Sequence, residues 1–420
     1  MDAACIWTAR RSTSREHPKR FSAMKLAGFA VGLAMLASSS GLWAEPSGRP
    51  AAEIDYSTAP FRMTRVLGWG SRPDWSADGR KLAFTESDVR DTHAYELDLA
   101  TRTVRCLTCR LGMAGMVTRV YYLPDGSFLL LAPRNIGSED VSRRTDTISD
   151  VMDQELYWMS APGAPLQPLG APAFGEIAIS RDVAKDGSVR LGWGELRKDR
   201  SLLHIATLSL ANGRASLSDG RILYDSAKRH EPASVTMSEA YGFADNNRAL
   251  TFYTILADGK TVNGEMYQVD IASGKLSSLY DDPAHSETHL FPDERYGLEE
   301  TNRSSDPAGA YRGVSSHDAG VLSFVAKYSG MRLPSPAELA DYAPHGMLKG
   351  FDRPFDLYVV RRDGAAPPRR LTRFSELGVN THQSAPAPDG RRIAFAVDLR
   401  GQKAPTVQEG LYIGEFGPAN

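Results

Sequence analysis

The sequence predicts an all-β fold, and three observations lead to this prediction. First, Gly 37 and Pro 25 together make up about 15% of the 420 residues, more turn-forming residues than a helical protein usually carries. Second, a turn followed by an apolar strand recurs along the chain. Third, another strand motif alternates with the first at regular spacing. The composition, 42% hydrophobic and 24% charged, is that of a folded globular chain.

The first motif is a turn containing Asp-Gly that precedes a β-rich apolar run. Its strong copies are Ala77–Phe84, Pro124–Leu131 and Pro388–Phe395. Such turns favour hairpins, and the runs that follow have strand-forming composition. Weaker copies occur at Asp186–Leu191, Asp245–Phe252 and Pro292–Leu298. These copies predict six structural units.

The second motif starts at a Tyr or Leu and ends near a Leu-Thr pair. Tyr95 to Leu107, Tyr157 to Leu169 and Tyr267 to Leu279 are all separations of twelve residues. The last copy, Leu411–Phe416, has no partner strand after it, and Phe61–Val66 supplies one from the start of the chain. Two motifs per unit predict four strands per unit. We therefore expect a six-bladed β-propeller of four-stranded antiparallel blades, with the last blade closed by the N-terminal strand.

These motifs resemble those of the TolB-like six-bladed propellers. The blades of that family carry a Trp-Ser-Pro-Asp-Gly-like turn and a Leu-Tyr strand followed by Leu-Thr. The closest matches here are Trp75–Gly79 and the pair Leu357-Tyr358 with Leu371-Thr372, and the resemblance covers about residues 55–420. It implies the same fold. It does not extend to TolB itself, which has an additional α/β domain ahead of its propeller.

A seven-bladed propeller is the alternative, because 96 residues separate Asp293 from Asp389, against 47 between Asp78 and Asp125. However, residues 302–350 contain neither motif, and Pro334–Asp341 is typical of a short capped helix. We therefore expect a leader at residues 45–60 and one propeller at residues 61–420, with an insertion at 302–350.

Residues 1–44 have the pattern of a signal peptide, with residues 1–23 as an overlong start or an extended n-region. Met24-Lys25 precedes the apolar run Leu26–Ala37, and Ala44 offers a cleavage point. The run is shorter than the ~20 residues that span a bilayer. We expect a periplasmic or secreted protein without a transmembrane segment after processing. Beyond residue 44 the chain has 43 basic and 49 acidic residues, which disfavours nucleic-acid binding.

Cys106 and Cys109 are the cysteines left after this cleavage. Disulfides persist in exported proteins, so we expect these two residues to be bonded to each other. An extended strand would hold their Cα atoms too far apart, and the bond therefore requires a turn after Leu107-Thr108. No His follows Cys109, so neither covalent haem nor a four-Cys zinc site is indicated.

A polar ring is expected at the mouth of the central channel, because the residue six positions before each turn Asp precedes an innermost strand. These residues are Arg72, Arg119, Glu239, Glu287 and Gln383; Glu176 fits only if the third unit is longer than the others. Opposed charges around a concave mouth favour a polar ligand, and His289 lies beside them. A solvated rim without a ligand is the alternative. Because we expect these groups to be solvated, Arg119→Ala should leave the melting temperature nearly unchanged.

A divalent metal site is a further alternative in this region. His285, Glu287 and His289 alternate along one strand and so share a face, and His382 in the next unit could complete a site for a first-row metal. No other cofactor is indicated.

Two functions compete on this evidence. The first is an exported envelope propeller that binds a protein or glycan without catalysis, because no nucleophile with an oriented base is found. The second is a metal-assisted polysaccharide lyase related to the oligogalacturonate lyases, in which Arg72 and Arg119 would face an acidic sugar and a cation would offset the enolate charge. The Gln-x-x-His-x-His ligand run of that family is absent. A serine peptidase is disfavoured because the sequence has no Gly-x-Ser-x-Gly.

Overall fold

A computed structural model describes residues 54–86, 92–111, 116–143, 153–197, 200–228, 234–257, 262–280, 287–305, 354–399 and 407–417. Within the compact unit Arg49–Asn420 they form antiparallel β-sheets, which confirms the all-β prediction. The helical segments described are short: α1 (Glu139–Ser142), η1 (Cys109–Leu111), η2 (Ser226–Lys228) and η3 (Phe374–Leu377). The expected signal peptide, residues 1–44, and most of the expected insertion lie outside these ranges.

In the described ranges, no helix has the length and apolar character that a bilayer crossing needs.

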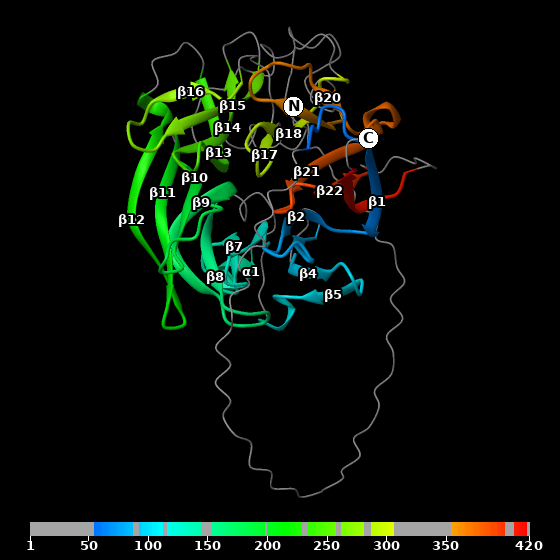
Figure 1. Ribbon diagram of the computed structural model, residues 1–420. Helices are drawn as coiled ribbons and strands as arrows, with labels where there is room; N and C mark the ends of the chain where they lie inside the picture. The colour runs from blue at the N-terminus through cyan, green and yellow to red at the C-terminus, as the bar shows by residue number, and fades with distance from the viewer. Residues whose placement is uncertain are drawn as a thin grey trace, which may run out of the picture. The chain divides into compact units, whose positions relative to one another are not determined.

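Four of the sheets are four-stranded antiparallel blades (Figure 1). The first contains β2 (Ser71–Trp75), β3 (Lys81–Thr85), β4 (Ala94–Asp98) and β5 (Thr103–Cys106). The second contains β13 (Ser234–Ala244), β14 (Ala249–Ala257), β15 (Val262–Asp270) and β16 (Leu276–Ser278), and the third contains β17 (Thr288–Leu290), β18 (Tyr296–Thr301), β19 (Asp356–Arg361) and β20 (Arg369–Arg370). The fourth contains β21 (Asn380–Pro386), β22 (Arg392–Asp398), β23 (Gly410–Phe416) and β1 (Phe61–Leu67).

The remaining sheet corrects the predicted blade count. It is seven-stranded and contains β6 (Arg119–Tyr122), β7 (Phe128–Pro133), β8 (Gln154–Met159), β9 (Gln167–Ile179), β10 (Val189–Leu196), β11 (Ser201–Ala211) and β12 (Arg214–Asp225). The 13-residue strand β9 pairs with β8 through its first half and with β10 through its second half. Because β9 continues without a break from the second repeat into the third, these two repeats form one sheet and not two separate blades. The prediction of six blades, and the alternative of seven, is wrong: there are four four-stranded blades and this longer sheet.

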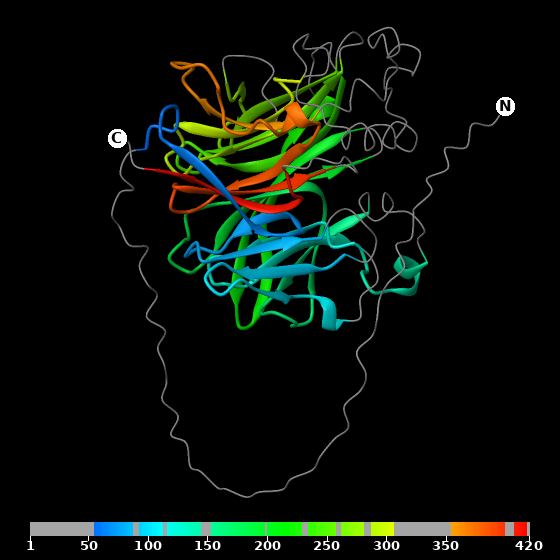
Figure 2. The same cartoon turned by 90° about the vertical axis from the view of Figure 1, so that its right-hand side faces the viewer.

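The two ends of the described chain meet in one blade. β1 pairs antiparallel with β23 from Phe61 opposite Phe416 to Leu67 opposite Leu411. Figure 2 shows this blue strand beside the red one. The predicted sharing of a blade between the N- and C-terminal strands is therefore present.

The innermost strands follow one another around a ring: β2 contacts β6, β9 contacts β13, β13 contacts β17, β17 contacts β21, and β21 contacts β2. Between β6 and β9 the ring is completed by side-chain hydrogen bonds from Arg119 and Tyr121 to Glu176. This is a propeller arrangement. Apolar side chains fill the space between neighbouring sheets, for example Phe291, Phe395 and Phe416, each at most 1% exposed. A Cβ atom on Gly194 would lie 2.4 Å from the Ser238 carbonyl oxygen, so this glycine lets β10 approach β13 closely.

The repeated Asp turns connect the innermost strand of a unit to the next strand. In the turns at Asp78 and Asp389 the Asp Oδ1 accepts the backbone N–H of the residue two positions on, at 3.0 Å and 2.8 Å. The same bond occurs at Asp125, Asp186 and Asp293. Gly79 has φ +65° and so takes a conformation that other residues rarely adopt. Since these turns follow the innermost strands, the residues that begin those strands lie at the opposite end of the channel.

The Cys106–Cys109 disulfide is present, as the sequence predicted. The chain leaves β5 at Cys106 and enters η1 at Cys109, so the two Cα atoms are 5.8 Å apart. The required turn at Leu107-Thr108 is therefore formed.

Candidate functional site

A cavity of about 220 Å³ lies where the innermost strands converge. Residues of β2, β6, β9, β13, β17 and β21 line it, and Glu300 of β18 also contributes. The lining includes Arg72, Arg119, Glu287, His289 and Gln383 of the predicted set. The sequence repeat therefore brings these five residues to one cavity.

Glu239 is the predicted residue that does not line this cavity. Its side chain packs over Gly175 of the neighbouring strand, since a Cβ atom there would lie 2.4 Å from Glu239 Cδ. Glu176 takes part instead. The sequence placed Glu176 in the ring only if the third unit were longer, and β9 is the 13-residue strand that supplies this length.

Backbone irregularities aim side chains into the cavity. The pairing register shifts between Ser71 and Asp74 in β2, and between His382 and Ala385 in β21. Arg72 and Gln383 occupy these shifts with φ of 54° and 56°. A non-glycine residue in this conformation costs about 1–3 kcal/mol, and such strain is concentrated at functional sites. The two strained residues are linked, because Arg72 N–H donates to Gln383 Oε1 at 3.1 Å.

Two further innermost strands have register shifts close to residues that line the cavity. In β9 the shift falls beside Gly175, whose φ is +76°, and Glu176 follows it. In β13 it falls between Ala240 and Gly242, so that Tyr241 is the extra residue. Bulges of this kind redirect a side chain or bend a strand, and they are common beside active sites.

Arg119 and Glu176 form a buried ion pair. Their side chains are 11% and 15% exposed, and Arg119 Nε donates to Glu176 Oε1. The Tyr121 hydroxyl donates to Glu176 Oε2 at 2.5 Å. Burial raises the pKa of Glu176, but the Arg119 charge and the Tyr121 hydrogen bond outweigh this effect and hold its pKa below the ordinary value. Glu176 is therefore ionised at neutral pH, and the expectation that Arg119 is solvated is wrong.

Two other carboxyl groups that line the cavity have a raised pKa, in contrast to Glu176. Asp74 Oδ2 accepts the Tyr122 N–H at 2.7 Å, and Glu300 accepts the N–H groups of Gln383, at 2.6 Å, and Ser384. Burial raises the pKa of Asp74 and of Glu300 to about 7 each. Near neutral pH these groups are partly protonated, so each can donate as well as accept a hydrogen bond.

An aromatic pair forms another part of the wall. The rings of Tyr241 and His289 have centroids 4.8 Å apart. Burial lowers the pKa of His289 to about 4, so its imidazole is neutral at pH 7. Burial raises the pKa of the Tyr241 hydroxyl well above its usual value, so that group stays protonated.

The alternative metal set is described only in part. His285 lies outside the described residues. Over the ranges that the structure describes, Glu287, His289 and His382 do not form a group of ligand atoms close enough to hold one ion. The group that does is His93, Cys106 and Cys109, in another part of the fold.

No protein-family model and no curated protein matches this sequence. Similar solved structures include a candidate TolB from Agrobacterium tumefaciens, with 12% identity, a TM-score of 0.41, and coverage of 86% of this chain and 98% of the other. An oligogalacturonate lyase in complex with manganese has 14% identity, a TM-score of 0.43 and coverage of 84% and 78%. The calcium-binding protein regucalcin from Agrobacterium tumefaciens has 10% identity, a TM-score of 0.44 and coverage of 85% and 94%.

These values assign no family. At such identities and TM-scores, the substrates and ions of those proteins say nothing about this chain. A function has to be argued from the site itself.

Proposed function

We propose that this chain is an exported envelope protein that binds a polar segment of a protein or glycan at the channel mouth, without catalysis. The observation that carries the proposal is the convergence of strained bulges at Arg72 and Gln383 on one cavity with charged walls. Strain of this kind is retained where the surrounding structure holds side chains in a required position. The residue pattern 24–44 supports export.

The size of the cavity limits what can enter. Its volume of about 220 Å³ is smaller than the roughly 300–1,000 Å³ of sites that enclose a drug-sized ligand. One sugar ring or one amino-acid side chain of a longer ligand is a suitable size. The rest of that ligand would lie along the rim.

The lining can satisfy many hydroxyl or amide groups at once. Glu287 and Arg72 offer charged partners, and Asp74 and Glu300 can donate or accept near neutral pH. The Arg119–Glu176 pair is held in place by Tyr121. A preformed polar wall of this type favours binding because few side chains need to be ordered when the ligand enters.

Binding is favoured over turnover by the state of the available bases. Among the described residues that line the cavity, the histidine is His289, and its pKa of about 4 makes it a weak base. The Tyr121 hydroxyl already donates to Glu176. These groups offer no activated nucleophile.

One observation favours the lyase alternative. The pKa of Asp74 and Glu300, about 7, lies in the range that suits a general acid or base at neutral pH. A lyase would in addition need a cation site, and the ligands expected for one are not gathered among the described residues.

A screen of purified protein against a glycan array and a peptide library tests the proposal, with metal content measured on the same sample. We expect the wild-type protein to bind a ligand from this screen and Arg72→Ala to lose that binding. Asp389→Asn, which alters a turn at the other end of the channel, should still bind the ligand. Release of an unsaturated product from an acidic oligosaccharide would instead support the lyase. Binding that Asp389→Asn abolishes and Arg72→Ala preserves would contradict the proposed site.

A further inference from the structure

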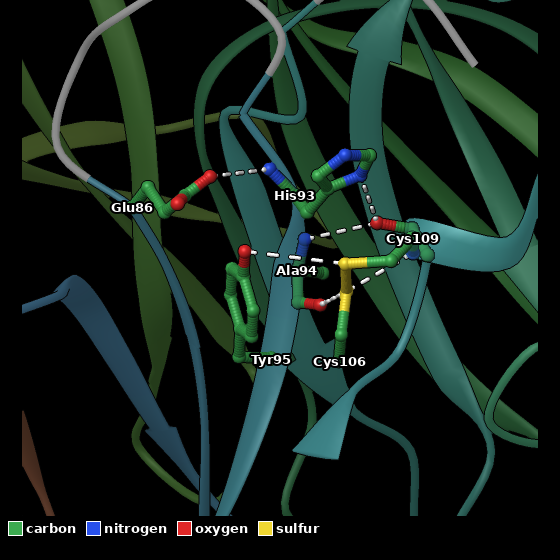
Figure 3. Close-up of a disulfide and its surroundings, with 7 residues drawn as sticks. Glu86, His93, Ala94, Tyr95, Cys106 and Cys109 are labelled. Atoms are coloured by element: carbon green, nitrogen blue, oxygen red, sulfur yellow. Dashed lines mark hydrogen bonds between the residues drawn. A yellow bond between two sulfur atoms is a disulfide. The ribbon is translucent and has the colours of Figure 1, made fainter. Parts of the chain in front are cut away.

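His93, Cys106 and Cys109 form a second cluster of chemically active side chains, and none of the three lines the cavity (Figure 3). One ring nitrogen of His93 and the two sulfur atoms all lie within 4.8 Å of one another. The two cysteines are joined as a disulfide.

The fold of the first blade brings the histidine to the cysteines. β4 and β5 are paired so that Tyr95 lies opposite Cys106, and His93 is two residues before Tyr95. Thr108, between the two cysteines, then holds this arrangement. Its Oγ1 accepts the Ala94 N–H at 3.1 Å and lies 3.1 Å from His93 Nδ1, so the imidazole ring is oriented by the same turn that carries the sulfurs.

These three side chains make up a metal-ligand set once the disulfide is reduced. Two thiolates separated by two residues, with one imidazole, match the ligand types and spacing of zinc sites. The Cys109 N–H already points to Cys106 Sγ at 3.0 Å, and a hydrogen bond of this kind stabilises a thiolate. The Thr108 hydroxyl, 3.1 Å from His93 Nδ1, is a hydrogen-bond partner of the kind that orients ligating histidines.

A carboxylate lies near His93 but is not among the three residues whose ligand atoms are gathered. Glu86 Oε2 accepts the His93 backbone N–H at 3.2 Å, so its carboxylate lies beside the cluster. Water can supply the fourth ligand of a tetrahedral site.

We propose that His93, Cys106 and Cys109 are a redox-controlled site for Zn²⁺. In the oxidised state each sulfur is bonded to the other and the site is closed to metal. A dithiol reductant supplies two electrons and two protons, is itself oxidised to a disulfide, and leaves two thiols on the protein. Zn²⁺ then binds as both thiols release their protons and the neutral imidazole donates its lone pair.

The cluster is accessible to both reagents. Cys109 is exposed, and Cys106 and His93 are partly exposed. The disulfide closes a loop with a sequence separation of 3, so its reduction should cost little chain entropy and leave the fold intact.

The test is a titration of the whole protein with Zn²⁺ alone, before and after anaerobic reduction and removal of the reductant. We expect the reduced protein to bind one equivalent of Zn²⁺ and the oxidised protein none at this cluster. Replacement of zinc by Co²⁺ should produce thiolate-to-cobalt charge-transfer absorption. His93→Gln should weaken binding at least about tenfold, whereas His204→Gln, in which the altered histidine pairs with Glu195 on another sheet, should not.

Three results would overturn the proposal. They are absence of Zn²⁺ binding by the reduced protein, equal affinity of wild type and His93→Gln, and loss of the native circular dichroism spectrum on reduction. The last counts against it because the cluster depends on the register of β4 and β5. Since the channel mouth plays no part in this titration, its failure would leave the proposed ligand site unaffected.

Discussion

Truncation of Arg119 should destabilise the fold markedly, because it leaves the Glu176 carboxylate without its charged partner in a buried position. The two side chains are only 11% and 15% exposed. Breaking a buried pair by removing one partner typically costs about 3–5 kcal/mol. Because Tyr121 still donates to Glu176, we expect the lower end of this range for Arg119→Ala.

This cost converts into a measurable thermal shift. Over the unit Arg49–Asn420, an unfolding entropy of about 2.1 cal/mol/K per residue turns about 3 kcal/mol into a Tm decrease of about 4 °C. Chemical denaturation gives the free energy of unfolding independently, and calorimetry gives the Tm.

The molecule contains a matched control for burial. Arg62 and Glu415 also form a short Arg–Glu pair, at 2.6 Å, but their side chains are 79% and 45% exposed. Arg62→Ala should cost no more than about 1 kcal/mol. The double variant Arg119→Met with Glu176→Leu removes both charges and should be more stable than Arg119→Ala. If Arg119→Ala and Arg62→Ala have the same small effect, the buried ion pair does not stabilise the channel wall and the reasoning fails.

Three other outcomes are expected. Since burial raises the pKa of Asp74 from 3.8 to about 7, the folded state holds a proton that the unfolded state loses. The free energy of unfolding should therefore fall as the pH rises from about 4 to 7, by at most about 1.4 kcal/mol per pH unit. Asp74→Asn should flatten this slope in denaturant titrations, and identical slopes for variant and wild type would refute the assignment. Gly175→Ala should destabilise the fold more than Gly126→Ala, because its Cβ would lie 2.4 Å from Glu239 Cδ. At Gly126 nothing lies within 4 Å, and only the positive φ costs about 1–2 kcal/mol. Equal losses of stability in the two variants would contradict the packing described. Intact-mass analysis of periplasmic material should give a chain that begins near residue 45, and a start before residue 30 would exclude cleavage at Ala44.

Local sequence signals predicted most of the fold, since they act within a few residues. The Asp turns at Asp78 and Asp389 use their own carboxylate to close the turn, and such turns are readable from composition. The blade count could not be obtained in this way. The blade count depends on whether β9 is one continuous strand or two, and its pairing with both β8 and β10 decides this. The repeat at Asp186, which follows β9, was one of the weaker copies of the motif.

The candidate site was predictable where it follows the repeat and not where it depends on contacts between distant segments. Arg72, Arg119 and Gln383 share a repeat position and were found. Asp74 and Glu300 were missed, because their partners Tyr122 and Gln383 are 48 and 83 residues away in the sequence. His93 could not be recognised beside Cys106 from the sequence for the same reason, since strand register and not sequence spacing places it there.

A calorimetric titration of the ligand found by screening tests the central proposal most directly, with Glu287→Gln compared to Asp186→Asn. Glu287 is part of the cavity lining and only partly buried, so its neutral isostere changes the mouth with little effect on folding. Asp186 belongs to a turn at the other end of the innermost strands. We predict about tenfold weaker binding by Glu287→Gln and unchanged binding by Asp186→Asn. Unchanged affinity in Glu287→Gln together with a loss in Asp186→Asn would show that the ligand does not bind at the channel mouth.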